Sequence, residues 1–170
     1  MPEDAWLVTG EQIPSARRLH RATSTFDALA DLPRLTAHLE GEAQGSSGPL
    51  PYRRMPSRFA RQMRNWPGYR SGASVSGNWY RSTQRDFATF AGMAQGDRYP
   101  GALRIANSLW WEAKKQDPAA DPDDLRSGIV PPYRNDAFVD KWRKLEMDRP
   151  SWTLTAHLGK DTYSHIHYDS

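Results

Sequence analysis

Prolines and glycines interrupt this chain often, which limits the length of most of its secondary-structure elements. The 170 residues include 13 prolines and 12 glycines, and both residue types punctuate helices and strands. We therefore expect short elements joined by long connections. Hydrophobic residues make up 38% of the chain, which suits one domain (1–170) with a modest core. Seven tryptophans and seven tyrosines favour a folded chain, because disordered chains are poor in aromatic residues.

Several classes of protein are excluded by what the sequence lacks. There is no cysteine, so this chain can hold no disulfide, no thiolate metal site and no cysteine nucleophile. No run of 18 apolar residues occurs, so we expect no transmembrane helix and no membrane partner. The opening stretch MPEDAWLVTG carries acids where a secretory leader needs bases, which makes a cytoplasmic location the expectation.

Positive charge is concentrated in one part of the chain, residues 51–85, which we call the arginine block. The formal net charge is only +3, yet the block contains no acid. Arginine without lysine favours forked hydrogen bonds to phosphates or base edges. Interleaved aromatic residues strengthen the prediction of nucleic-acid contact, although a solvated basic face would carry the same charge. The block holds eight arginines: Arg53, Arg54, Arg58, Arg61, Arg64, Arg70, Arg81 and Arg85.

Hydrophobic periodicity and capping residues predict five short helices. Thr23 or Ser24 can cap the first helix, and Ser57 can cap the second. The predicted helices lie at 22–33, 56–67, 82–96, 101–116 and 135–148. In three of them, large apolar residues lie three or four positions apart on the predicted buried face: Phe59, Met63 and Trp66; Phe87, Phe90 and Met93; Phe138, Trp142 and Leu145.

Composition predicts connections between these helices. Residues 40–51 have the composition of a flexible linker, and residues 69–82 that of a loop rich in Gly and Ser. A third, acidic connection broken by prolines precedes the last helix. Alternation in the tail predicts two strands, at 153–158 and 163–168. Isolated hairpins are marginal in water, so we expect residues 150–170 to be frayed or paired with another copy. The expected fold class is α+β, with short helices around a small β element and long irregular loops.

The tail also carries a longer pattern. Residues 133–167 are YRNDAFVDKWRKLEMDRPSWTLTAHLGKDTYSHIH. This stretch resembles bacterial DNA cytosine-5 methyltransferases, which carry a DKY.RL..D.PS.T.TAHL.KD.Y..IHP pattern. Upstream, TSTFDALADLP at 23–33 is similar to the TV.DAI.DLP segment of that family, and residues 79–106 are similar to a middle segment of some members. So many matching positions at fixed spacing are far more specific than a short motif.

The resemblance implies a target-recognition region, the smaller lobe that faces the catalytic lobe across a DNA cleft. The family's F.G.GG cofactor loop, PCQ nucleophile loop, ENV glutamate and QRR.R segment are all missing from this sequence. In the family, a cysteine thiolate attacks a flipped-out cytosine, which then accepts a methyl group from S-adenosylmethionine. We therefore expect one part of a larger enzyme, inactive alone, with no cofactor in this chain. Its expected partners are double-stranded DNA and the catalytic lobe.

The resemblance also places DNA contacts in the tail. Thr153 and Thr155 match the family's T.T pair, which lies at the DNA backbone, and Lys160 follows in the turn. Hydroxyl groups and a lysine suit phosphate oxygens, although threonine is also common in ordinary strands. No catalytic residue is predicted. The predicted DNA-binding set consists of Arg53, Arg54, Arg58, Arg61, Arg64, Arg70, Arg81, Thr153, Thr155 and Lys160.

Two other functions remain open from the sequence. A free-standing basic nucleic-acid-binding module would carry the same arginine block without any enzyme. A small metallonuclease would use tail histidines, because an H-x-H pair places two imidazoles on one strand face. The simpler interpretation is that the IH pair belongs to the family's IHP motif, with Tyr168 in place of the proline. The residues that a metal site would use are His157, His165 and His167 with Asp161 or Asp169.

Overall fold

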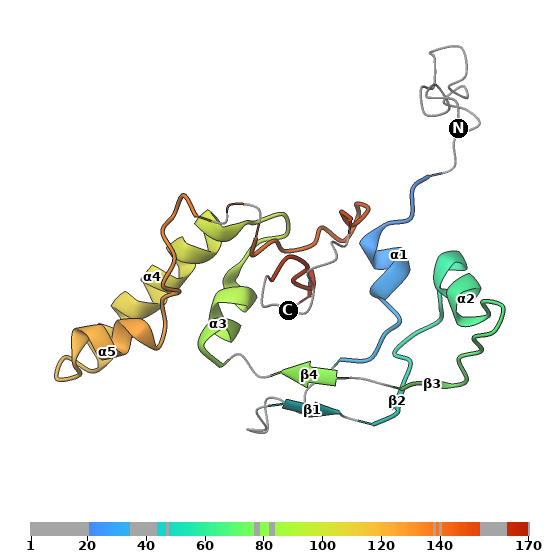
Figure 1. Ribbon diagram of the computed structural model, residues 1–170, viewed down its shortest axis with the longest axis horizontal. Coiled ribbons are helices and arrows are strands. Elements are labelled where there is room, and N and C mark those ends of the chain that lie inside the picture. The colour runs from blue at the N-terminus through green and yellow to red at the C-terminus, as the bar shows by residue number, and fades with distance from the viewer. Residues whose placement is uncertain are drawn as a thin grey trace, which may run out of the picture.

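The computed structural model describes residues 21–34, 44–46, 48–76, 79–81, 84–137, 139, 141–153 and 163–169. Within these residues, short helices and two-stranded sheets confirm the α+β class (Figure 1). The helices are α1 (Thr25–Leu29), α2 (Arg58–Arg64), α3 (Gln84–Gly92), α4 (Tyr99–Gln116) and α5 (Pro122–Ser127). The strands are β1 (Gln44–Ser46), β2 (Leu50–Pro51), β3 (Ser74–Val75) and β4 (Trp79–Arg81).

Side-chain caps set the starts of α1 and α2, as predicted. The backbone N–H of Asp27 donates to Ser24 Oγ at 3.1 Å, and the N–H of Ser24 donates back to the Asp27 carboxylate at 3.0 Å. This reciprocal pair is a capping box. In α2, Ser57 Oγ accepts a hydrogen bond from the N–H of Ala60 at 3.0 Å. Both helices therefore begin where a polar side chain can satisfy an N–H group that has no partner within the helix.

Replacing Ser24 with alanine should lower the free energy of unfolding by about 1 kcal/mol, the usual cost of losing an N-cap. The N–H of Asp27 would lose its acceptor, and Ser24 is itself buried. Chemical denaturation measures the change. Thr23→Ala serves as the control, because Thr23 is exposed and was the other predicted cap. Equal losses in the two variants would contradict the cap assignment.

Helix α4 confirms its prediction, whereas α5 was missed. Helix α4 carries Pro100 in its first turn and ends in two lysines, which suit the carbonyl end of a helix. Helix α5 lies in the acidic stretch predicted as a loop. Asp121 caps it, and Pro122 occupies its first turn. A proline in the first turn starts a helix rather than breaking one. The N–H group that proline lacks would have no partner within the helix at that position. None of the described helices could cross a membrane.

Two small antiparallel sheets join segments that the composition marked as connections. Strand β1 pairs with β4, with Gly45 opposite Tyr80. Strand β2 pairs with β3, with Leu50 opposite Val75. The stretch 40–51, expected to be a linker, thus contains one strand of each sheet. Prediction missed these strands because each has only two or three residues, too few to show an alternating pattern.

Residues 135–148 do not form the predicted helix, and that prediction was wrong. Trp142 has a φ of 54°, which an α-helix excludes, and Lys144 forms a parallel β-bridge with Ile166. The backbone N–H of Lys144 donates to the carbonyl of Asp97 at 2.9 Å. These partners lie far away in the sequence, so the spacing of apolar residues could not reveal them.

The core forms where α3 and α4 meet the extended segment around Trp142. The Trp142 ring lies 5.4 Å from Phe90, 5.6 Å from Tyr99 and 5.0 Å from Tyr163, measured between ring centroids. Tyr99 is fully buried, and its hydroxyl donates to the carbonyl of Tyr133 at 2.6 Å. Offset and edge-on aromatic pairs of this kind stabilise a core beyond their buried area.

Predicted burial was right for the helices that join this core and wrong for α2. Phe90 and Met93 of the third predicted helix are buried. So are Trp142 and Leu145, although their segment is extended. Phe138 lies outside the described residues. The predicted inward face of the second helix is wrong at two positions. Met63 on α2 is 39% exposed, and Trp66, which lies beyond the end of α2, is 50% exposed.

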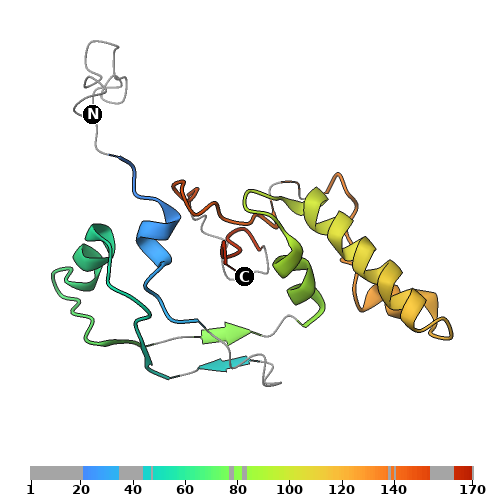
Figure 2. The ribbon, with the colours of Figure 1, turned by 180° about the vertical axis from the view of Figure 1, so that it is seen from behind.

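Residues 163–169 pack in the middle of the molecule, between α1 and α3 in both views (Figures 1 and 2). Ile166 is buried, and its N–H donates to the carbonyl of Arg143 at 2.9 Å. The ring of Tyr168 lies 6.4 Å from that of Phe26 on α1. The expectation of a frayed tail is therefore wrong for these residues. The predicted strand at 153–158 and the turn after it lie outside the described residues beyond Thr153.

Candidate nucleic-acid interface

Two arginines of the block form ion pairs with buried carboxylates. Arg64 on α2 donates to the carboxylate of Asp31, which is only 3% exposed. The Arg64 guanidinium also lies over the Tyr52 ring, 3.2 Å from its centroid. The side chain of Arg64 is 17% exposed, so solvent has little access to it. Arg64, one of the predicted DNA-binding residues, anchors α2 to the chain after α1.

Arg85 is held in the same way by its neighbour in α3. Its Nε donates to the Asp86 carboxylate at 2.7 Å and a terminal nitrogen at 3.0 Å, which is a forked pair. Asp86 is 2% exposed, and its hydrogen bonds raise the pKa of the Arg85 guanidinium. The fork engages two of the five N–H donors of Arg85.

Two further arginines of the block, Arg53 and Arg54, are partly engaged by other side chains, and so is Arg34, which lies outside the block. Arg53 lies 3.9 Å from the carboxylate of Asp169, and Arg34 donates to the same oxygen. The hydrogen bond from Arg34 lowers the pKa of Asp169. Arg54 lies over the ring of Phe26, 5.3 Å from its centroid. Sequence reasoning missed Arg34, because it stands alone outside the arginine block.

Three arginines of the block remain exposed and open to a ligand. Arg58 and Arg61 lie one turn apart on α2, and Arg70 lies in the connection to β3. Within the described residues no carboxylate lies within ion-pair distance of any of the three. Figure 1 shows α2 and this connection at one end of the molecule, with α4 and α5 at the other. We call these three side chains the exposed arginine set.

The connection after α2 begins with a tight turn that displays aromatic side chains. The N–H of Tyr69 donates to the carbonyl of Trp66 at 2.8 Å, and Gly68 has a φ of 83°. Proline second and glycine third are the residues of a type II turn, which needs a positive φ at the third position. Trp66 is 50% exposed and Tyr69 is 77% exposed. The turn therefore presents two aromatic faces beside the exposed arginine set.

A shallow hollow between α1 and α2 lies beside Arg58 of the exposed arginine set. Its volume is about 480 Å³, and its lining includes Arg21 and Arg58. Asp27 also lines it and lies 3.8 Å from Arg21. The hollow thus has mixed charge, with the exposed arginine of α2 on one side.

Of the remaining predicted contacts, the described residues include Arg81 and Thr153. Arg81 lies in β4 opposite Gln44. Thr153 is exposed at the end of the extended segment. Thr155 and Lys160 lie outside the described residues, so their predicted phosphate contacts stay predictions.

The tail histidines have other partners where the structure describes them. The ring of His165 lies tilted against that of Trp152, with 5.3 Å between the centroids, and its Nδ1 is 2.9 Å from Ser164 Oγ. His167 Nδ1 accepts a hydrogen bond from the N–H of Asp169 at 3.1 Å, and burial lowers the pKa of this imidazole. Among the described residues, no group of three His, Asp or Glu side chains could hold a metal ion. His157 and Asp161 lie outside those residues.

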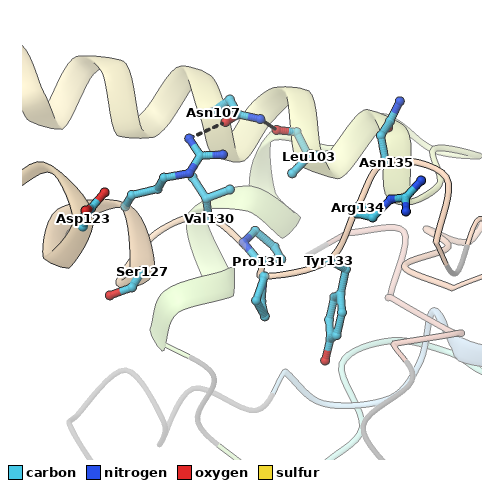
Figure 3. A pocket seen from close by; sticks show the side chains of 11 residues that line it. Leu103, Asn107, Asp123, Ser127, Val130, Pro131, Tyr133, Arg134 and Asn135 are labelled. Carbon is cyan, nitrogen blue, oxygen red and sulfur yellow. Dashed lines mark hydrogen bonds between the residues drawn. The ribbon is translucent and has the colours of Figure 1, made fainter.

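A second hollow, of about 480 Å³, lies between α4, α5 and the chain that follows (Figure 3). Asn107 crosses its upper side, donating to the carbonyl of Leu103 at 2.7 Å and accepting from Arg126 at 3.2 Å. Tyr133 and Arg134 border it on the other side. Asn107 and Arg126 thus engage each other, and Arg134 pairs with Asp136 outside the lining.

Comparison with known proteins gives one relative of interest. Over 98 residues the chain is 46% identical to the protein named "Putative type II methyltransferase M.OihORF3336P", from Oceanobacillus iheyensis. The match covers 55% of this chain and 21% of the relative, so the chain spans about a fifth of that protein's length. No family model and no solved structure matches. The similarity supports the methyltransferase part of the resemblance drawn from the sequence.

Proposed function

We propose that this chain is the DNA-binding target-recognition part of a DNA cytosine-5 methyltransferase. The observation that carries the proposal is the exposed arginine set, Arg58, Arg61 and Arg70, in a stretch of sequence without any acid. The similarity to a protein named a putative type II methyltransferase supports the methyltransferase part of the proposal. The cytosine-5 chemistry rests on the tail pattern at 133–167.

In this proposal the chain supplies binding and register, and another part of the enzyme supplies the chemistry. Forked guanidinium groups on α2 would bind phosphate oxygens and fix α2 on the duplex. The turn at 66–69 would bring its aromatic faces against sugars or bases beside those phosphates. Base-reading contacts would come from the neighbouring connection, which carries Arg70.

The described residues do not fit S-adenosylmethionine. Such a cofactor needs a glycine-rich turn beside its binding slot, whereas the lining of neither hollow contains a glycine. With no cysteine in the chain, we assign it no step of methyl transfer.

The test has two parts. The chain should select, from a pool of random duplexes, sequences that share a short motif containing cytosine. With tritiated S-adenosylmethionine and DNA, the chain alone should incorporate no label, because the thiolate that attacks cytosine is missing. Incorporation by the chain alone would contradict the proposal. Binding without any enriched motif would instead favour the free-standing basic module.

A further inference from the structure

A carboxylate near the C-terminus holds two arginines that come from distant parts of the chain. Arg34 follows α1, and Arg53 follows β2. Both guanidinium groups approach the same oxygen, Oδ2 of Asp169. Two cations that converge on one oxygen form the kind of site that binds a phosphate, because arginine forks match the oxygens of a phosphate group.

The C-terminal segment is positioned to place this carboxylate. The N–H of Asp169 donates to His167 Nδ1, and the ring of His167 stacks on that of Tyr168 at 4.3 Å. Tyr168 in turn packs near Phe26 of α1. Because Ile166 is buried in the core, the residues that follow it are held close to Arg34 and Arg53.

The contact is weak enough for a polyanion to displace it. The side chains are 58% exposed for Arg34, 36% for Arg53 and 46% for Asp169. Ion pairs this exposed usually contribute little to stability. A DNA phosphate carries one negative charge on two free oxygens, as a carboxylate does, but the neighbouring phosphates of the duplex add to its attraction for the same two guanidinium groups.

The pair also lies next to the structural anchor of α2. The N–H of Arg53 donates to the backbone carbonyl of Asp31 at 2.9 Å, and the carboxylate of Asp31 holds Arg64. Arg53 is thereby tied through Asp31 to the helix that carries the exposed arginine set. A phosphate bound by this pair would lie on an element already linked to the proposed interface.

We propose that Arg34 and Arg53 form a phosphate-binding pair, which Asp169 occupies as an internal competitor until DNA displaces it. This inference rests on the proposed function for its natural ligand, a DNA phosphate. It adds Arg34, which lies outside the arginine block, and gives Asp169 a part in setting DNA affinity.

Asp169→Asn tests the inference, because asparagine keeps the shape of the side chain and removes its charge. Duplex affinity at low salt should rise about fivefold, the upper end of what an exposed ion pair contributes, and the log-log salt slope should steepen by about 1 to 2. Asp148→Asn is the matched control, since Asp148 is also exposed. Adding Arg34→Ala to Asp169→Asn should remove the gain.

Inorganic phosphate provides a readout that does not depend on DNA binding. In nitrogen-15 NMR spectra, the Nε–H signals of Arg34 and Arg53 should shift with phosphate in Asp169→Asn at lower concentration than in the control. An unchanged affinity, slope and phosphate response in Asp169→Asn would overturn the inference and leave the proposed function standing. A phosphate response without any duplex binding would support the pair and count against the proposed function.

Discussion

Replacing Arg58, Arg61 and Arg70 together with alanine should weaken binding to duplex DNA on the order of a hundredfold at 0.1 M salt. Each guanidinium that neutralises one phosphate releases condensed counterions, so three lost contacts should also reduce the log-log salt slope by about 2.7. All three side chains are exposed, so the variant should keep its fold. Fluorescence anisotropy across a salt series measures both quantities.

The matched control removes three exposed arginines on or beside α4, outside the arginine block: Arg98, Arg104 and Arg134. The two variants have equal net charge and differ in where the charge is lost. If affinity depends on α2 and its following turn, the control should lose far less. Equal losses in affinity and slope would mean that DNA responds to the overall charge of the chain, and the interface would have to be sought elsewhere.

Local features of this fold could be predicted from sequence, because their causes are local. Ser24 and Ser57 start helices by hydrogen bonds that span three residues, and residues at such a spacing can be recognised in the amino-acid sequence. Helix α5 was also visible in principle, since Asp121 followed by Pro122 is a helix start. Treating the prolines of that stretch only as breakers hid the signal.

Long-range pairing could not be predicted in the same way. Trp142 and Leu145 are buried as expected, but an apolar spacing of three also fits an extended segment whose two faces are both covered. The choice depended on two hydrogen bonds, from the N–H of Lys144 to Asp97 and from the N–H of Leu145 to Ile166. Asp97 lies 47 residues from Lys144 along the chain, and Ile166 lies 21 residues from Leu145. Nothing in a window of local sequence contains that information.

At the candidate site, too, local features could be predicted from the sequence and long-range pairs could not. The arginine block was found from composition, yet composition treats all of its arginines alike. What separates Arg64 from Arg61 is the buried carboxylate of Asp31, contributed by another segment of the chain. Arg85 stands beside Asp86 in the sequence, so its pairing had a local signal that the charge count passed over.

Replacing Arg64 with alanine should destabilise the fold by about 3 to 5 kcal/mol, the usual cost of removing one partner from a buried ion pair. Asp31 would keep a carboxylate that is only 3% exposed, and the Tyr52 ring would lose the cation that covers it. Native domains are stable by about 5 to 15 kcal/mol in total, so the loss is a large part of the whole. Urea denaturation followed by tryptophan fluorescence measures the change.

Two further variants make this result specific. Arg61→Ala removes an exposed arginine from the same helix and should change stability by no more than about 0.5 kcal/mol. The double variant Asp31→Leu with Arg64→Met should recover most of the loss, because apolar residues of similar size often replace a buried ion pair without cost. If Arg64→Ala is as mild as Arg61→Ala, the pair with Asp31 does not anchor α2. Arg64 would then return to the set of arginines available to DNA, and its removal should flatten the salt slope instead.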